Sequence, residues 1–194
     1  MSAGTAILIV FGALFLIVII SIIWAITIYN GLVSKRELVN EGWSSIDVQL
    51  KRRFNLIKNL VSVVKQYAAH EAETLEGLTN ARSAAYTDDI GERASAEAQI
   101  GSALVDMLSV TEAYPDLKAD GNFRDLQQEL SQLEDVIQRS RRYYNGTVRD
   151  YNTLVGSFPH LLIANMYLFR EAAFFEIENE DERKLPEIDF GEKA

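Results

Sequence analysis

Apolar and polar positions along this chain separate into one continuous apolar block and a series of periodic segments. The block runs from Ala6 to Ile28 and carries no charged residue. At about 1.5 Å of rise per residue, a helix of this length spans roughly 35 Å, slightly more than the roughly 30 Å hydrocarbon core of a bilayer. A secretory signal peptide is the main alternative, but its shorter apolar region follows a positive stretch, which residues 1–5 lack. The pattern predicts a transmembrane helix over 6–28, preceded by a short tail.

Beyond the block, apolar residues recur at spacings of three and four, which is one face of a helix. This face comprises Val39, Trp43, Ile46, Leu50, Phe54, Ile57, Val61, Val64 and Ala68. Because the same phase continues to Ala85, this helix either extends that far or breaks near His70. We also expect it to continue directly from the transmembrane segment.

A turn over 86–91 separates this helix from a second one, which reaches Tyr114 and is expected to end at Pro115 and Gly121. Its apolar positions are Ala94, Ala98, Leu104, Val105 and Leu108.

A third helix has the clearest period in the chain, with apolar residues every seven positions. These are Phe123, Leu130, Ile137, Tyr144, Tyr151 and Phe158, complemented by Leu126, Leu133 and Leu154, with Asn122 as a candidate N-cap. The stripe is interpreted first as the core of a bundle, with a self-association seam as the alternative.

Pro159 fits the first turn of a fourth helix, whose stretch Leu161–Phe175 is too apolar to be left in water. This stretch closes the bundle, forms a subunit interface, or lies at the membrane surface. A candidate interaction surface follows: Leu162, Met166, Phe169, Phe174 and Phe175, with Ile188 and Phe190 further on. The predicted fold is all-α, with a single transmembrane helix and an antiparallel bundle of three to four long helices over 29–178. Residues 179–194 are predicted to be an acidic, disordered tail.

Charge and residue inventory exclude several classes of function. Of the net charge of -9, residues 176–194 supply -5, because they hold eight acids and three bases. The remaining domain is only mildly acidic, which argues against nucleic acid as a partner. The chain has no cysteine, and neither His70 nor His160 completes a metal-binding or di-iron pattern. We therefore expect no enzymatic activity, no metal and no cofactor.

The residues flanking the block predict its orientation. Lys35 and Arg36 are the first charged residues after it, whereas no Lys or Arg precedes it. The positive-inside rule then places the domain in the cytoplasm, with a periplasmic domain as the alternative. Trp24 and Tyr29 are suited to the aromatic belt of the bilayer, and the two bases to lipid headgroups.

A cluster of charges lies on the first helix beyond the membrane. Asp47 and Lys51 are four residues apart and can pair. The predicted role of the cluster is a polar network between helices that fixes their register; it comprises Asp47, Lys51, Arg52, Arg53 and Arg82. A basic collar on lipid headgroups is the alternative for the bases.

Several motifs closely resemble the LemA family of bacterial membrane proteins. They include Ile46-Asp-Val-Gln-Leu-Lys-Arg-Arg53, Tyr114-Pro-Asp-Leu-Lys-Ala119, Tyr144-Asn145, Tyr151-Asn152 and Phe158-Pro159. The resemblance implies an N-terminal single-pass anchor and a soluble bundle of mostly antiparallel helices. The family includes proteins required for building magnetosome membranes, and its members often occur beside HtpX-type membrane metalloproteases.

Two functions follow as hypotheses for a single-pass protein of the bacterial inner membrane. The first is a non-enzymatic scaffold that binds the lipid bilayer, forms homo-oligomers and organises or remodels the membrane. The second is an adaptor of a membrane metalloprotease, which would recognise the acidic tail and its Leu185–Phe190 motif.

Overall fold

The computed structural model describes residues 3–68, 87 and 89–176, and every regular element in this part of the chain is a helix. The elements are α1 (Ala3–Tyr67), α3 (Ile90–Val110), the 3₁₀ turn η1 (Thr111–Ala113), α4 (Pro115–Ala119), α5 (Gly121–Gly156) and α6 (His160–Met166). The predicted all-α fold is confirmed.

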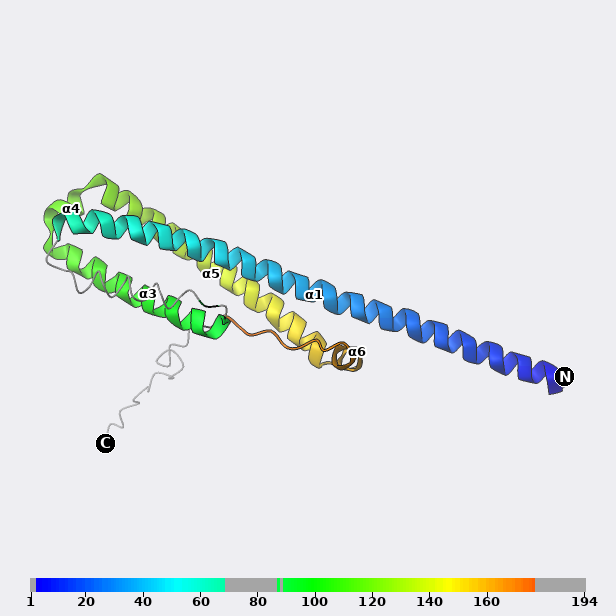
Figure 1. Ribbon diagram of the computed structural model, residues 1–194. Coiled ribbons are helices and arrows are strands. Elements are labelled where there is room, and N and C mark those ends of the chain that lie inside the picture. Colours follow the sequence, from blue (N-terminus) through cyan, green and yellow to red (C-terminus); the bar gives the residue numbers. More distant parts are fainter. Residues whose placement is uncertain (1–2, 69–86, 88, 177–194) are drawn as a thin grey trace, which may run out of the picture. The chain divides into compact units, whose positions relative to one another are not determined.

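Helix α1 is 65 residues long. Its blue-to-cyan ribbon runs without a break in Figure 1. From Ile7 to Ile26, its large apolar side chains are exposed, and within the described residues it is the helix long and apolar enough to cross a membrane. The predicted continuation of the apolar segment into the next helix is confirmed. The helix ends at Tyr67, close to the predicted break near His70. Residues 69–86, including His70, lie outside the described part.

Contacts group the chain into two units, each holding part of α1 and part of α5. The first contains residues 1–53 and 130–174. In it, Lys35 lies against Asp150, while Arg53, further along α1, lies against Glu134, which precedes Asp150 on α5. The two helices therefore run antiparallel.

In the first unit, α1 and α5 approach each other closely at Gly42, which is buried. A Cβ added there would lie 3.3 Å from Tyr144 Cα and 3.4 Å from Thr147 Oγ1. The ring of Trp43 packs at 5.6 Å from that of Tyr144. A residue without a side chain on α1 thus makes room for a large, fully buried aromatic on α5.

The second unit contains residues 54–129 and the chain from Phe175 onward. Its fully buried side chains include Leu60 and Val64 of α1, Met107 of α3 and Leu117 of α4. At the start of α3, the carboxylate of Asp89 accepts a hydrogen bond from the backbone N–H of Glu92, at 2.8 Å. This N-cap satisfies a backbone donor that has no partner inside the helix.

Three expectations about helix ends are wrong. Pro115 and Gly121 do not close a helix: Pro115 opens α4, where its fixed φ suits the first turn, and Gly121 opens α5. The N-cap of α5 is not Asn122 either. Asp120 takes that role, because its Oδ1 accepts the N–H of Phe123 at 2.9 Å.

The seven-residue stripe of the third predicted helix is confirmed as core over most of α5. Five of its members are buried, namely Phe123, Leu130, Ile137, Tyr144 and Tyr151, and so is the complementary Leu133. Phe158 is the exception, with 79% of its surface exposed, because α5 ends at Gly156. Val105, predicted on the apolar face of α3, is also 62% exposed.

The predicted fourth helix is much shorter than expected, since α6 ends at Met166 rather than near Phe175. Leu168 has a φ of 57°, and the Phe169 N–H donates to the Ala164 carbonyl at 2.9 Å. These are the features of a Schellman C-cap, which usually has glycine at the left-handed position. Because leucine stands there instead, the sequence carried no stop signal.

Candidate membrane-proximal site

The apolar side chains of α1 change from exposed to buried at Ile28. Before it, large apolar side chains point outward from the helix, as at Ile23 and Ile26, which are 59% and 54% exposed. Ile28 is the first of its buried residues, and Leu32 and Val39 follow on the same face. The candidate site is therefore the part of the first unit around Ile28, where the exposed span of α1 becomes a packed helix.

An aromatic cluster lies at this boundary. Tyr29 of α1 contacts Tyr167 and Phe169 edge to face, with ring centroids at 4.8 and 5.6 Å. The Arg36 guanidinium lies over the Phe169 ring, 5.1 Å from its centroid. Such aromatic pairs and cation–π contacts each contribute about 0.5–1.5 kcal/mol. The cluster fixes the chain after α6 against α1.

Beside this cluster, α6 and α1 border a groove of about 350 Å³. Its lining is mostly apolar and comprises Ile22, Ala25, Ile26, Tyr29, Ile163, Met166 and Tyr167. The first three residues belong to the exposed span, so α6 lies at the level of its last turns.

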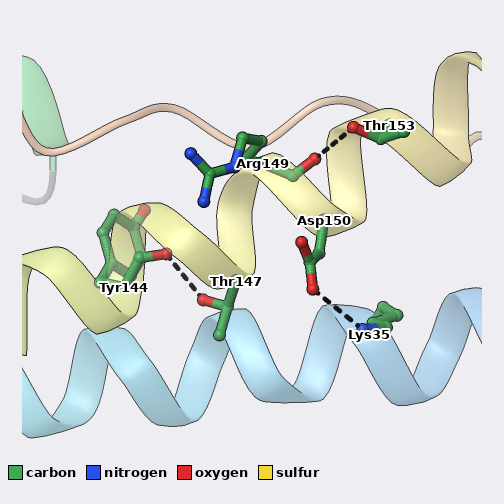
Figure 2. Close-up of polar contacts among 6 residues, drawn as sticks. All are labelled: Lys35, Tyr144, Thr147, Arg149, Asp150 and Thr153. Carbon is green, nitrogen blue, oxygen red and sulfur yellow. Dashed lines mark hydrogen bonds and ion pairs between the residues drawn. The ribbon is translucent and has the colours of Figure 1, made fainter.

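The two bases expected at lipid headgroups have contacts inside the first unit. Lys35 Nζ lies 3.2 Å from Asp150 Oδ2 (Figure 2), while Arg36 has the ring contact described above and lies 3.9 Å from Glu37. Trp24, the other residue assigned to the membrane interface, is 47% exposed on α1. The Lys35 pair is largely exposed, so it adds little to stability.

Beyond α6, residues 169–176 have no regular secondary structure, and polar side chains of α5 bind the backbone at Ala172 and Ala173. The Asn152 Nδ2 donates to the Ala172 carbonyl at 2.9 Å, and the Asn152 Oδ1 accepts the Ala172 N–H at 2.8 Å. The Tyr144 hydroxyl donates to the Ala173 carbonyl at 2.7 Å. Burial raises the pKa of Tyr144 to about 12. These bonds satisfy backbone groups that a helix would have satisfied internally.

The predicted polar network is distributed along α1. Lys51 Nζ lies 2.6 Å from Asp47 Oδ2, the pair expected from their spacing. Arg53 is buried and lies 3.4 Å from Glu134 of α5, an ion pair between helices. Arg52 is exposed, and Arg82 lies outside the described residues.

The candidate interaction surface is divided by the structure. Leu162 and Met166 of α6 are 56% and 71% exposed, and Phe174 is 40% exposed. Phe169 and Phe175 are buried, so they do not belong to an open surface. Ile188 and Phe190 lie outside the described residues.

Sequence reasoning missed two parts of this site. Phe158 and Leu168, which are 79% and 76% exposed, extend the apolar surface around α6. Asn152, which the sequence marks only as part of the Tyr151-Asn152 motif, holds a non-helical segment. The Tyr151-Asn152 motif identifies the position of Asn152 in the sequence, but which residue Asn152 binds depends on how the chain folds back after α6.

Within the residues that the structure describes, no group of three or more His, Asp or Glu side chains is placed to hold a metal ion.

Comparison with known proteins identifies the family. The sequence profile of the LemA family matches residues 42–190. The LemA protein of Metamycoplasma hominis is 28% identical over 170 residues, covering 86% of this chain and 78% of that protein. Magnetosome proteins MamQ 1 and MamQ 2 of Paramagnetospirillum magneticum are each 25% identical over 175 residues and cover 76% of the chain, which spans 64% of their length. Because the profile covers well over half of it, the chain belongs to the LemA family.

Proposed function

We propose that the chain is a non-enzymatic, membrane-anchored scaffold that self-associates and organises or remodels the bacterial membrane. The observation that carries this proposal is the continuity of α1 from Ala3 to Tyr67. One rigid helix both exposes an apolar span and supplies Leu32, Val39 and Ile46 to the packed core. The first unit is thus coupled to the span without an intervening linker.

Self-association is assigned to the span rather than to the stripe of α5. The apolar stripe of α5 packs inside the chain, since Ile137, Tyr144 and Tyr151 are buried. In the span, Gly12 has nothing within 4 Å of the position its Cβ would occupy, and Ala13 follows it. Small residues let two transmembrane helices approach closely, so this patch is the proposed contact.

The relatives support a role at membranes. Three of them are magnetosome proteins, from Paramagnetospirillum magneticum and Magnetospirillum gryphiswaldense. A structural role for this chain would be consistent with that designation.

The proposal is tested by measuring the mass of the full chain purified in mild detergent, together with electron microscopy of membranes from overexpressing cells. We expect particles with more than one chain and altered membrane morphology. Gly12→Leu should lower the mass, because its side chain separates the helices. Gly4→Leu, outside the predicted span, adds the same bulk and should leave the mass unchanged. A monomer that leaves membranes unaltered would overturn the proposal.

The protease-adaptor hypothesis stays a prediction from the acidic tail, which lies outside the described residues. Deleting residues 181–194 should abolish co-purification of a membrane metalloprotease. Unchanged recovery of the protease would count against it.

A further inference from the structure

The segment from Phe158 to Leu168 presents an apolar surface that nothing in the described chain covers fully. Its exposed members are Phe158, Leu161, Leu162, Met166, Tyr167 and Leu168, with exposed fractions from 38% to 79%. On the opposite side, Ile163 and Ala164 are buried. Apart from the exposed Asn165, both the buried and the open sides of the segment are therefore apolar.

This surface lies beside the span. Met166 and Tyr167 share the groove with Ile22, Ile26 and other residues of α1. Ile22 precedes Ile28, the end of the apolar block, by six residues, or about 9 Å along the helix. If α1 crosses the bilayer over its apolar block, α6 then lies about 5–10 Å below the polar boundary, the depth at which interfacial helices bind.

The composition of the segment fits this depth. From Ser157 to Phe169 there is no Asp, Glu, Lys or Arg, and Arg170 and Glu171 follow immediately. Tyr29 and Tyr167 contact each other at this level, and Tyr29 and Arg36 both contact the Phe169 ring. Aromatic and basic residues of this kind anchor proteins at the membrane interface.

Several backbone polar groups of the segment bond internally, which an apolar medium favours. The N–H groups of Leu161, Tyr167 and Phe169 donate to the carbonyls of Ser157, Ile163 and Ala164, at 2.8, 3.1 and 2.9 Å. The turn at Leu168 is thereby closed by the C-cap of α6.

We propose that residues 158–168 form a second membrane contact, embedded among the lipid acyl chains of the leaflet on the bundle side. Lipid is the occupant that the position favours, because whatever covers Met166 must itself lie beside Ile22 and Ile26 of the span. The contact enlarges one leaflet only, and shallow one-sided insertion of this kind makes binding sensitive to curvature. It gives the chain a means of bending the membrane.

The test uses the full chain reconstituted in phosphatidylcholine vesicles. Because the chain has no cysteine, single variants Leu162→Cys and Met166→Cys can each carry one environment-sensitive fluorophore. We expect a blue-shifted emission and strong quenching by lipids brominated near the headgroup. That quenching should be at least about fivefold greater than at a water-exposed site, as for an interfacial helix.

Two matched variants calibrate the measurement. Ile17→Cys, 61% exposed in the span, reports the deep acyl region and should be quenched best by lipids brominated near the chain end. Val48→Cys, 56% exposed on the same helix, lies about 30 Å beyond Ile28 and should respond only to aqueous iodide.

Two results would overturn the inference. If labels at 162 and 166 behave like the label at 48, the segment lies in water. If neither brominated lipid nor iodide quenches them, protein covers the segment, and dependence of that shielding on the protein-to-lipid ratio would identify a second copy. The inference rests on the membrane attachment in the proposed function but not on self-association, which the mass measurement tests separately.

Discussion

Asn152 and Ala172 bind each other through a pair of hydrogen bonds, in which one side-chain amide serves both the N–H and the carbonyl of one backbone residue. The amide replaces the partners that a helix or a sheet would provide. Both hydrogen bonds are partly buried, so neither backbone group is well placed to bond to water instead. The segment after α6 is held to α5 at this point.

Replacing Asn152 should therefore loosen this segment. Asn152→Ala leaves the Ala172 N–H and carbonyl without their partner, which costs about 1–3 kcal/mol in the free energy of unfolding. Urea unfolding of the full chain in detergent, followed by fluorescence of Trp43 in a Trp24→Phe background, measures this cost. Asn40→Ala is the control, because Asn40 makes an exposed bond to Glu37. Equal effects of the two substitutions would show that the amide contributes no special stability.

Gly42 and Gly146 should respond oppositely to alanine. At Gly146 nothing lies within 4 Å of an added Cβ, so Gly146→Ala should stabilise α5 by about 0.5–1 kcal/mol. At Gly42 the added methyl meets the Tyr144 backbone at 3.3 Å, and overpacking of this kind costs about 1–3 kcal/mol. The same unfolding assay should thus rank Gly42→Ala below Gly146→Ala by at least about 1 kcal/mol. The reverse order would mean that α1 and α5 separate without penalty.

Tyr144 should make stability fall in alkali. Burial raises its pKa from 10.0 to about 12, so the unfolded chain loses this proton at a lower pH than the folded chain. The free energy of unfolding therefore falls as the pH rises from about 10 to about 12, and is unaffected by this group below that window. In Tyr144→Phe the decline should be shallower, whereas Tyr143→Phe, at an exposed tyrosine, should keep it. Parallel pH profiles for wild type and Tyr144→Phe would contradict the assignment.

The orientation of the chain is testable with the same Val48→Cys variant. If the bundle is cytoplasmic, as the bases after the span predict, a membrane-impermeant maleimide should not label this cysteine in intact spheroplasts but should label it in inverted vesicles. Labelling from outside the spheroplast would place the bundle in the periplasm. A permeant maleimide controls for the reactivity of the thiol in both preparations.

The helices themselves were largely readable from the sequence. The apolar block, the spacing of Val39, Ile46 and Leu50, and the seven-residue stripe of α5 each repeat a local period that one helix face must bury. Such patterns predict a helix because each apolar residue at the repeated spacing indicates the same buried face. The apolar block likewise predicts a transmembrane span, because none of its residues is charged.

The tertiary structure decided where those patterns stop and what they meet. Asp120 rather than Asn122 caps α5, because the cap depends on the path of the chain leaving α4. Leu168 ends the turn after α6 in a conformation that local propensity assigns to glycine. Packing against Tyr29 and Arg36 holds Phe169 in place, and no local pattern encodes partners so distant in sequence. These contacts place α6 beside Ile22 of the span. That position makes the apolar stretch a candidate membrane contact.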